Sequence, residues 1–140
     1  MYRRILIPLD ISSTDKTIIN HIKPLVQLTK AEVILVHVAD GFGARLQEQL
    51  NLADSQEIVD DKLYLDTQTA LLQEQGISTK AFLIQGKEPV DGILSVAQSE
   101  GCDLIAMATH GHKFIKDMLL GSVADGLRHK THLPILMIRE

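Results

Sequence analysis

Residues 103–123, DLIAMATHGHKFIKDMLLGSV, combine an apolar run with two groups of small polar residues. The run Leu104–Ala108 has the length and composition of a strand that is buried on both faces. The turn Thr109-His110-Gly111 follows, and nine residues then precede Gly121-Ser122, where we predict that a helix begins at Ser122. Glycines let backbone N–H groups approach a bulky anion, and a helix N-terminus adds a positive dipole end. The stretch therefore predicts a phosphate-binding turn at the carboxyl end of a strand.

Strand-like and helix-like segments alternate along the rest of the chain. Each crossover between strands is long enough for a helix, so the strands should be parallel, with helices on both faces of the sheet. At 140 residues, the chain predicts a single α/β domain with an open five-stranded sheet. We predict strands over 3–9, 31–39, 78–84, 104–108 and 133–138, helices over 12–29, 55–75, 89–101 and 122–130, and a connecting loop over 40–54.

The order of the strands decides which residues can meet. The residue pattern leaves open the orders 2-1-3-4-5 and 3-2-1-4-5. Open α/β sheets bind ligands beyond the carboxyl ends of their strands, where the strand order reverses. Only the order 3-2-1-4-5 makes the first and fourth strands neighbours, so that Asp10 would lie beside Ala108–Gly111.

The residues around Asp10 predict where the first strand ends and the first helix begins. Pro8 cannot donate to a strand ladder and therefore marks the end of the strand. Ser12 and Asp15 have the spacing of a capping box, in which each side chain bonds the backbone amide of the other.

Composition excludes several classes of protein. A net charge of −4 without a basic stripe argues against nucleic-acid binding, and the sequence has no apolar run of the roughly 18–20 residues that a membrane span requires. The lone Cys102 fits a reducing cytoplasm. The pairs His110-x-His112 and His129-x-x-His132 lack accompanying ligands at metal-site spacing, so we predict no metal site.

Other nucleotide and flavin proteins with this alternation of elements have signals that are missing here. The third strand ends Ile84-Gln85-Gly86, without the aspartate that a receiver domain phosphorylates. Ser12-Ser13-Thr14 lacks the glycine and nearby aromatics of a flavodoxin loop, and no Gly-x4-Gly-Lys-Ser/Thr sequence marks a P-loop. The loops of adenylating enzymes near the first strand are also absent.

The spacing Ala108-x-x-Gly111-x9-Gly121-Ser122-Val123 resembles the Gly-x-x-Gly-x9-Gly-Ser/Thr nucleotide loop of the universal stress protein family. Ala108 is a departure, because the family has glycine there. The resemblance covers nearly the whole chain and implies a universal stress protein domain over 1–140. Its other matching segments are ILIPLD at 5–10, HV at 37–38, GKEP at 86–89 and PILMI at 134–138.

This resemblance implies the sheet order 3-2-1-4-5 of a Rossmann-like fold similar to the adenine nucleotide alpha hydrolases. It also implies ATP as the ligand, with or without Mg²⁺. Asp10 could accept hydrogen bonds from a ribose hydroxyl or the adenine amino group, and His110 would add positive charge near the phosphates. The binding positions that we expect are Pro8, Leu9, Asp10, Val38, Met107, Ala108, His110, Gly111, Gly121, Ser122 and Val123.

No nucleophile is paired with a base in the sequence, so we expect a regulatory module rather than an efficient enzyme. The resemblance implies a role in the stress response, with slow ATP hydrolysis or self-phosphorylation as a secondary activity. It also implies a homodimer through the last strand, Pro134–Ile138, which is apolar on both faces yet lies at a sheet edge. The alternative is a dimeric interaction protein of the same family that does not bind nucleotide.

Overall fold

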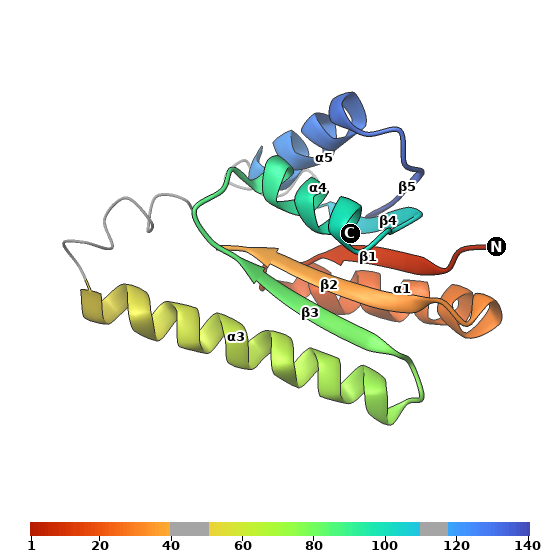
Figure 1. Ribbon diagram of the computed structural model, residues 1–140, viewed down its shortest axis with the longest axis horizontal. Coiled ribbons are helices and arrows are strands. Elements are labelled where there is room, and N and C mark those ends of the chain that lie inside the picture. The colour runs from red at the N-terminus through yellow and green to blue at the C-terminus, as the bar shows by residue number, and fades with distance from the viewer. Residues whose placement is uncertain (40–50, 110–117) are drawn as a thin grey trace.

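The computed structural model describes residues 1–39, 51–109 and 118–140, in which strands and helices alternate as predicted (Figure 1). Residues 1–39 contain the strands β1 and β2 with the helix α1, and the next described segment begins with the long helix α3. The elements are β1 (Arg4–Pro8), α1 (Ser13–Thr29), β2 (Glu32–Val38), α3 (Asn51–Glu74), β3 (Thr79–Ile84), α4 (Pro89–Ser99), β4 (Leu104–Thr109), α5 (Met118–Lys130) and β5 (Ile135–Arg139).

The strands form one parallel sheet in the order β3-β2-β1-β4-β5. The predicted order 3-2-1-4-5 is therefore confirmed, and the order 2-1-3-4-5 is excluded. β1 lies in the centre, between β2 and β4, and the sequence run Ile5–Ile7 is fully buried there. A strand that is covered on both faces is expected to be apolar, as this run is.

Two separate cores cover the two faces of the sheet. Ile5 and Ile7 pack with α1 and α3 on one face, whereas Leu6 packs with α4 and α5 on the other. Figure 1 shows the same arrangement, with α4 and α5 above the sheet and α1 and α3 below it. The prediction that helices cover both faces is therefore confirmed.

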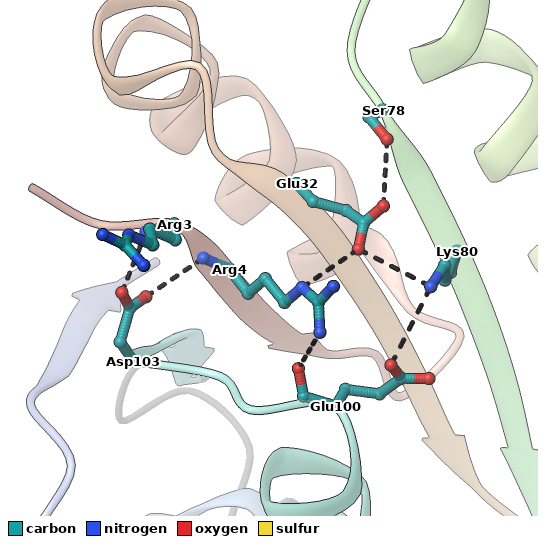
Figure 2. Close-up of polar contacts among 7 residues, drawn as sticks. All are labelled: Arg3, Arg4, Glu32, Ser78, Lys80, Glu100 and Asp103. Atoms are coloured by element: carbon teal, nitrogen blue, oxygen red, sulfur yellow. Dashed lines mark hydrogen bonds and ion pairs between the residues drawn. The ribbon is translucent and has the colours of Figure 1, made fainter.

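Polar contacts fasten the amino end of β1 to its neighbours (Figure 2). The Asp103 carboxylate accepts hydrogen bonds from the backbone amides of Arg3 (2.9 Å) and Arg4 (3.1 Å). The Arg4 guanidinium donates to the Glu100 carbonyl at 2.6 Å and lies 3.4 Å from the Glu32 carboxylate. Residues that begin β1 and β2 are thereby joined to the turn between α4 and β4.

Two helices begin earlier than the sequence pattern predicted. α3 begins at Asn51 rather than near Ser55, and α5 begins at Met118 rather than at Ser122. The four residues from Asn51 resemble a loop in composition, but Leu and Ala are strong helix formers. Met and Leu likewise extend α5 ahead of Gly121, because one glycine costs a helix only about 1 kcal/mol. Residues 40–50 of the predicted loop lie outside the described residues.

Candidate functional site

The neighbouring strands β1 and β4 stop pairing with each other before either strand ends. The β1–β4 ladder ends at Leu6 and Ile105. On its other side, β1 stays paired with β2 as far as Pro8, and β4 stays paired with β5 as far as Thr109. The sheet therefore opens at the carboxyl ends of β1 and β4, which is the point where the strand order reverses and where such sheets bind ligands.

Asp10 lies two residues after the end of β1 at this edge and is half-buried. Its Oδ1 accepts hydrogen bonds from the hydroxyls of Ser12 (2.5 Å) and Thr14 (3.2 Å). Ser12 is the N-cap of α1, with its Oγ accepting from the Thr14 amide at 3.3 Å. Asp10 itself is thus not the capping residue, and the hydroxyls at the start of α1 fix the orientation of its carboxylate.

A second carboxylate, that of Asp15, is almost completely buried behind this turn, with 2% of the residue exposed. It accepts hydrogen bonds from the backbone amides of Asp10 (3.1 Å) and Ile11 (2.8 Å) and from the Tyr64 hydroxyl (2.9 Å). The predicted capping box is therefore wrong in both halves, because the Ser12 hydroxyl accepts from the Thr14 amide whereas the Asp15 amide donates to the Ser12 carbonyl. Asp15 reaches past the Ser12 amide to the two amides before it, because the turn folds back over the first turn of α1.

Burial dominates the protonation equilibrium of Asp15. Loss of solvent raises the pKa of its carboxyl from the ordinary 3.8 to about 6, and the neighbouring Asp10 carboxylate also raises it. Hydrogen bonds from the Asp10 amide and the Tyr64 hydroxyl lower the pKa, but by less than burial raises it. Burial and Asp15 in turn raise the pKa of the Tyr64 hydroxyl, which keeps Tyr64 protonated as a donor.

Ile11 adopts a left-handed backbone conformation, with φ of 60°. A β-branched residue is a genuine outlier there, and such a conformation costs on the order of 1–3 kcal/mol unless its surroundings enforce it. Of the two backbone amides that donate hydrogen bonds to Asp15, the Ile11 amide makes the shorter one. Asp15 therefore helps to hold the strained residue that follows Asp10.

Helix α3 makes a second polar contact with this end of the sheet. His37, near the end of β2, has its Nδ1 2.8 Å from the Leu9 carbonyl oxygen. Since a carbonyl oxygen only accepts, Nδ1 donates in this bond. The other ring nitrogen, Nε2, lies 3.4 Å from the Asp61 carboxylate on α3. Helix α3 therefore makes two contacts near the end of β1. Asp61 contacts His37 on β2, and Tyr64 contacts Asp15 on α1.

Comparison with known proteins places the chain in a family. The model of the universal stress protein family matches residues 1–139. The chain belongs to the universal stress protein family. A curated relative, universal stress protein MJ0577 of Methanocaldococcus jannaschii, is 29% identical over 99% of this chain and 96% of its own length.

Solved structures of universal stress proteins share the fold. A structure of hypothetical protein MJ0577 matches 100% of this chain and 97% of its own, with a TM-score of 0.86 and 31% identity. A universal stress protein from Archaeoglobus fulgidus in complex with dAMP matches 98% of both chains, with a TM-score of 0.72 and 22% identity. Another, in complex with cAMP, matches 99% of this chain and 97% of its own, with a TM-score of 0.69 and 16% identity. At these lower identities, the last two likenesses show the fold.

The expected binding positions of this universal stress protein differ in exposure. Pro8, Asp10 and Val38 are half-buried, and Val38 packs on α4, since a Cβ added at Gly92 would lie 2.8 Å from its side chain. His110 and Gly111 lie outside the described residues. Four positions have side chains buried in the two cores and could face a ligand only with their backbone: Leu9, Met107, Ala108 and Val123.

Gly121 and Ser122 are exposed and lie inside α5 rather than before it. Gly121 is the fourth residue of α5 as the structure describes this helix, and residues 110–117 lie outside the described residues. A Cβ added at Gly121 would meet no atom of the described residues within 4 Å. Because parallel connections return from the carboxyl edge of the sheet, α5 starts on the side to which the strand arrows point (Figure 1). The opening turn of α5 is thus at the same edge of the sheet as Asp10.

Two further observations concern membrane-spanning helices and metal ligands. None of the helices in the described part of the chain combines the length and apolar content needed to cross a bilayer. Among the side chains that the structure describes, no three His, Cys, Asp or Glu residues are grouped as metal ligands would be.

Proposed function

We propose that this universal stress protein is a regulatory module that binds ATP or a related adenine nucleotide at the carboxyl edge of its sheet. One observation supports this proposal above others: β1 and β4 are neighbours whose pairing stops at Leu6 and Ile105. Asp10 and the start of α5 therefore belong to the edge where the sheet opens. A nucleotide has donors at its sugar and base and acceptors at its phosphates, and these residues offer the complementary groups.

The described residues fit such a ligand. The half-buried Asp10 carboxylate, oriented by Ser12 and Thr14, is an acceptor for a ribose hydroxyl or an adenine amino group. No described atom lies within 4 Å of the point where a side chain at Gly121 would begin, and the exposed Ser122 beside it has a hydroxyl that can donate to a phosphate. If the nucleotide binds together with Mg²⁺, the ion would lie at the phosphates.

The alanine at position 108 is compatible with this proposal. Ala108 is a residue of β4, 5% exposed, and its methyl group belongs to the core between the sheet and α1. We infer that this methyl fills space in the core rather than crowding a ligand. Two structural neighbours contain adenine nucleotides, dAMP in one and cAMP in the other, which favours adenine as the base.

The proposed role is regulation of the stress response, with any hydrolysis of ATP or self-phosphorylation secondary to binding. We propose in addition a cytoplasmic homodimer that pairs through β5. This strand is at a sheet edge, and Met137 in its middle is 43% exposed. An apolar edge strand is an aggregation hazard unless another chain or element covers it.

Titration of the purified protein with ATP by calorimetry tests the binding function directly. We expect saturable binding and an increase in melting temperature at millimolar ATP. Gly121→Val should weaken binding, because its side chain would occupy space beside Ser122 in which no described atom lies within 4 Å of the added Cβ. Ala70→Val is the matched control, since it adds a similar side chain at an exposed position of α3. If ATP neither binds nor shifts the melting temperature, the alternative function is favoured, namely a dimeric interaction protein that does not bind nucleotide.

A further inference from the structure

We propose that Asp15 and Tyr64 are positioning residues for the nucleotide site: Tyr64 on α3 holds the Asp15 carboxylate, and Asp15 holds the turn that carries Asp10. The inference rests on the proposed function, because it concerns the affinity of the same site. Neither residue carries a signal of nucleotide binding in the sequence. Their role follows from contacts that only the folded chain makes.

The Asp15 carboxylate holds the backbone of the turn that carries Asp10. Its two oxygens accept from consecutive amides, those of Asp10 and Ile11, which fixes the backbone on both sides of the peptide between them. Ile11 has φ of 60°, a conformation that an isoleucine does not hold by itself. Without Asp15, the turn would be free to relax toward an ordinary conformation, and the Asp10 carboxylate would move with it.

Tyr64 links the Asp15 carboxylate to α3. The Tyr64 hydroxyl donates to the Asp15 oxygen that also accepts from Ile11, at 2.9 Å. Tyr64 is half-buried and packs against the core beneath the sheet. Because a hydrogen bond to a buried carboxylate is among the stronger ones, the position of α3 is coupled to the turn. The contact of Asp61 with His37 supports the same coupling from β2.

The charged and titratable groups around Asp15 come from several elements. Asp10 faces it from the turn and Tyr64 from α3. The pair of His37 on β2 and Asp61 on α3 stands at the Leu9 carbonyl, one residue before Asp10. Glu140, which follows β5, accepts a hydrogen bond from the hydroxyl of Ser13, the residue after the N-cap. Lys16 follows Asp15 along α1. A pH profile of this site has to be compared with a variant that lacks Asp15 alone.

The opposite end of β1 offers a matched control. Asp103 also accepts from two consecutive amides of this strand, those of Arg3 and Arg4, but at the edge remote from Asp10 (Figure 2). Asp103→Asn therefore removes the same kind of contact from the same strand. If the effect of Asp15 were merely structural, the two substitutions would act alike on nucleotide affinity.

The experiment measures the dissociation constant for ATP and the melting temperature of the wild type, Tyr64→Phe, Asp15→Asn and Asp103→Asn. We expect Tyr64→Phe to weaken ATP binding about tenfold and Asp15→Asn at least as much. Asp103→Asn should lower the melting temperature and leave the dissociation constant within about twofold of the wild type. The ratio of the affinities of wild type and Asp15→Asn should fall as the pH drops below 6, since a protonated Asp15 accepts fewer hydrogen bonds. Because the protonation of ATP affects both affinities equally, it cancels in this ratio.

Amide hydrogen exchange without nucleotide completes the test. The Ile11 amide should exchange faster in Tyr64→Phe than in the wild type. Unchanged ATP affinity in Tyr64→Phe, or an equal loss in Asp103→Asn, would overturn the positioning role. If the wild type does not bind ATP, the proposed function fails, and exchange at Ile11 still decides the structural half: faster exchange supports the hold on the turn, and unchanged exchange overturns it.

Discussion

Replacing Asp15 with asparagine is expected to change how the stability of the protein depends on pH. Burial raises the pKa of Asp15 in the folded state to about 6, against 3.8 in an exposed aspartate. The folded state therefore binds a proton more readily than the unfolded state between these two values. Stability from this group is fully present below about pH 4 and is lost as the pH rises through about 6. The asparagine side chain in Asp15→Asn would not titrate and would lack this contribution.

The expected magnitude follows from the two pKa values. A pKa difference of one corresponds to about 1.4 kcal/mol, so the full contribution is about 3 kcal/mol. Almost none of it is expressed at pH 7, and about 2 kcal/mol is expressed at pH 4.5. The free energy of unfolding of the wild type, relative to that of Asp15→Asn, should therefore increase by about 2 kcal/mol between these pH values. The other carboxyl groups are common to both proteins and cancel in the comparison.

Urea unfolding at pH 7, 6, 5.2 and 4.5 would measure this difference, provided that the slope with urea is the same for both proteins. Two further variants test the cause. The pH range over which this stability contribution is lost should move to higher pH in Tyr64→Phe, because the Tyr64 hydroxyl lowers the pKa of Asp15. In Asp10→Asn it should move to lower pH, because the Asp10 carboxylate raises that pKa. A difference between wild type and Asp15→Asn that stays constant over this pH range would refute the reasoning.

The remaining predictions concern packing, assembly and reactivity. Gly126→Ala should lower the melting temperature and cost about 1–3 kcal/mol, because its Cβ would lie 2.7 Å from the Val90 side chain. Gly121→Ala, on the same helix, meets no described atom within 4 Å and should be at least as stable as the wild type, which calorimetric melting would show. Met137→Asp should convert a dimer to a monomer in sedimentation experiments, since it places a charge in the middle of the edge strand β5; a dimer that persists would argue against pairing through β5. Burial raises the pKa of the Cys102 thiol to about 11, so a thiol reagent at pH 8 should label it slowly in the folded protein and quickly in urea.

Much of the fold could be predicted because apolar runs and helix periodicity are local signals. The strands β1, β2 and β4 are buried on both faces, and each appears in the sequence as an almost uninterrupted apolar run. The order of the strands could not be obtained from the pattern, since either order satisfies the same alternation of elements. It came from the resemblance to a family, through the residues that follow β4.

The candidate site was predicted only in part. Asp10 follows a strand that ends at a proline, and this signal is visible in one short segment. The spacing of Ser12 and Asp15 predicts a capping box, which is wrong because sequence spacing does not show how the preceding turn folds back. Tyr64 and Asp61 lie far from Asp10 in the sequence and carry no motif. Their contacts depend on how α3 packs under β1 and β2, which is a tertiary property.

The two roles assigned to Asp15 require opposite responses to acid. Protonation removes a buried charge, so the fold should become more stable relative to Asp15→Asn as the pH falls through 6. The same proton removes an acceptor from the Asp10–Ile11 turn, so the affinity of the site should decrease. At neutral pH the protein therefore keeps an ionised group that its fold would be more stable without, as happens where function and stability compete. A residue that only stabilised the fold would show both quantities moving in the same direction. Opposite movement of stability and ATP affinity in one pH series would thus separate positioning from simple structural support.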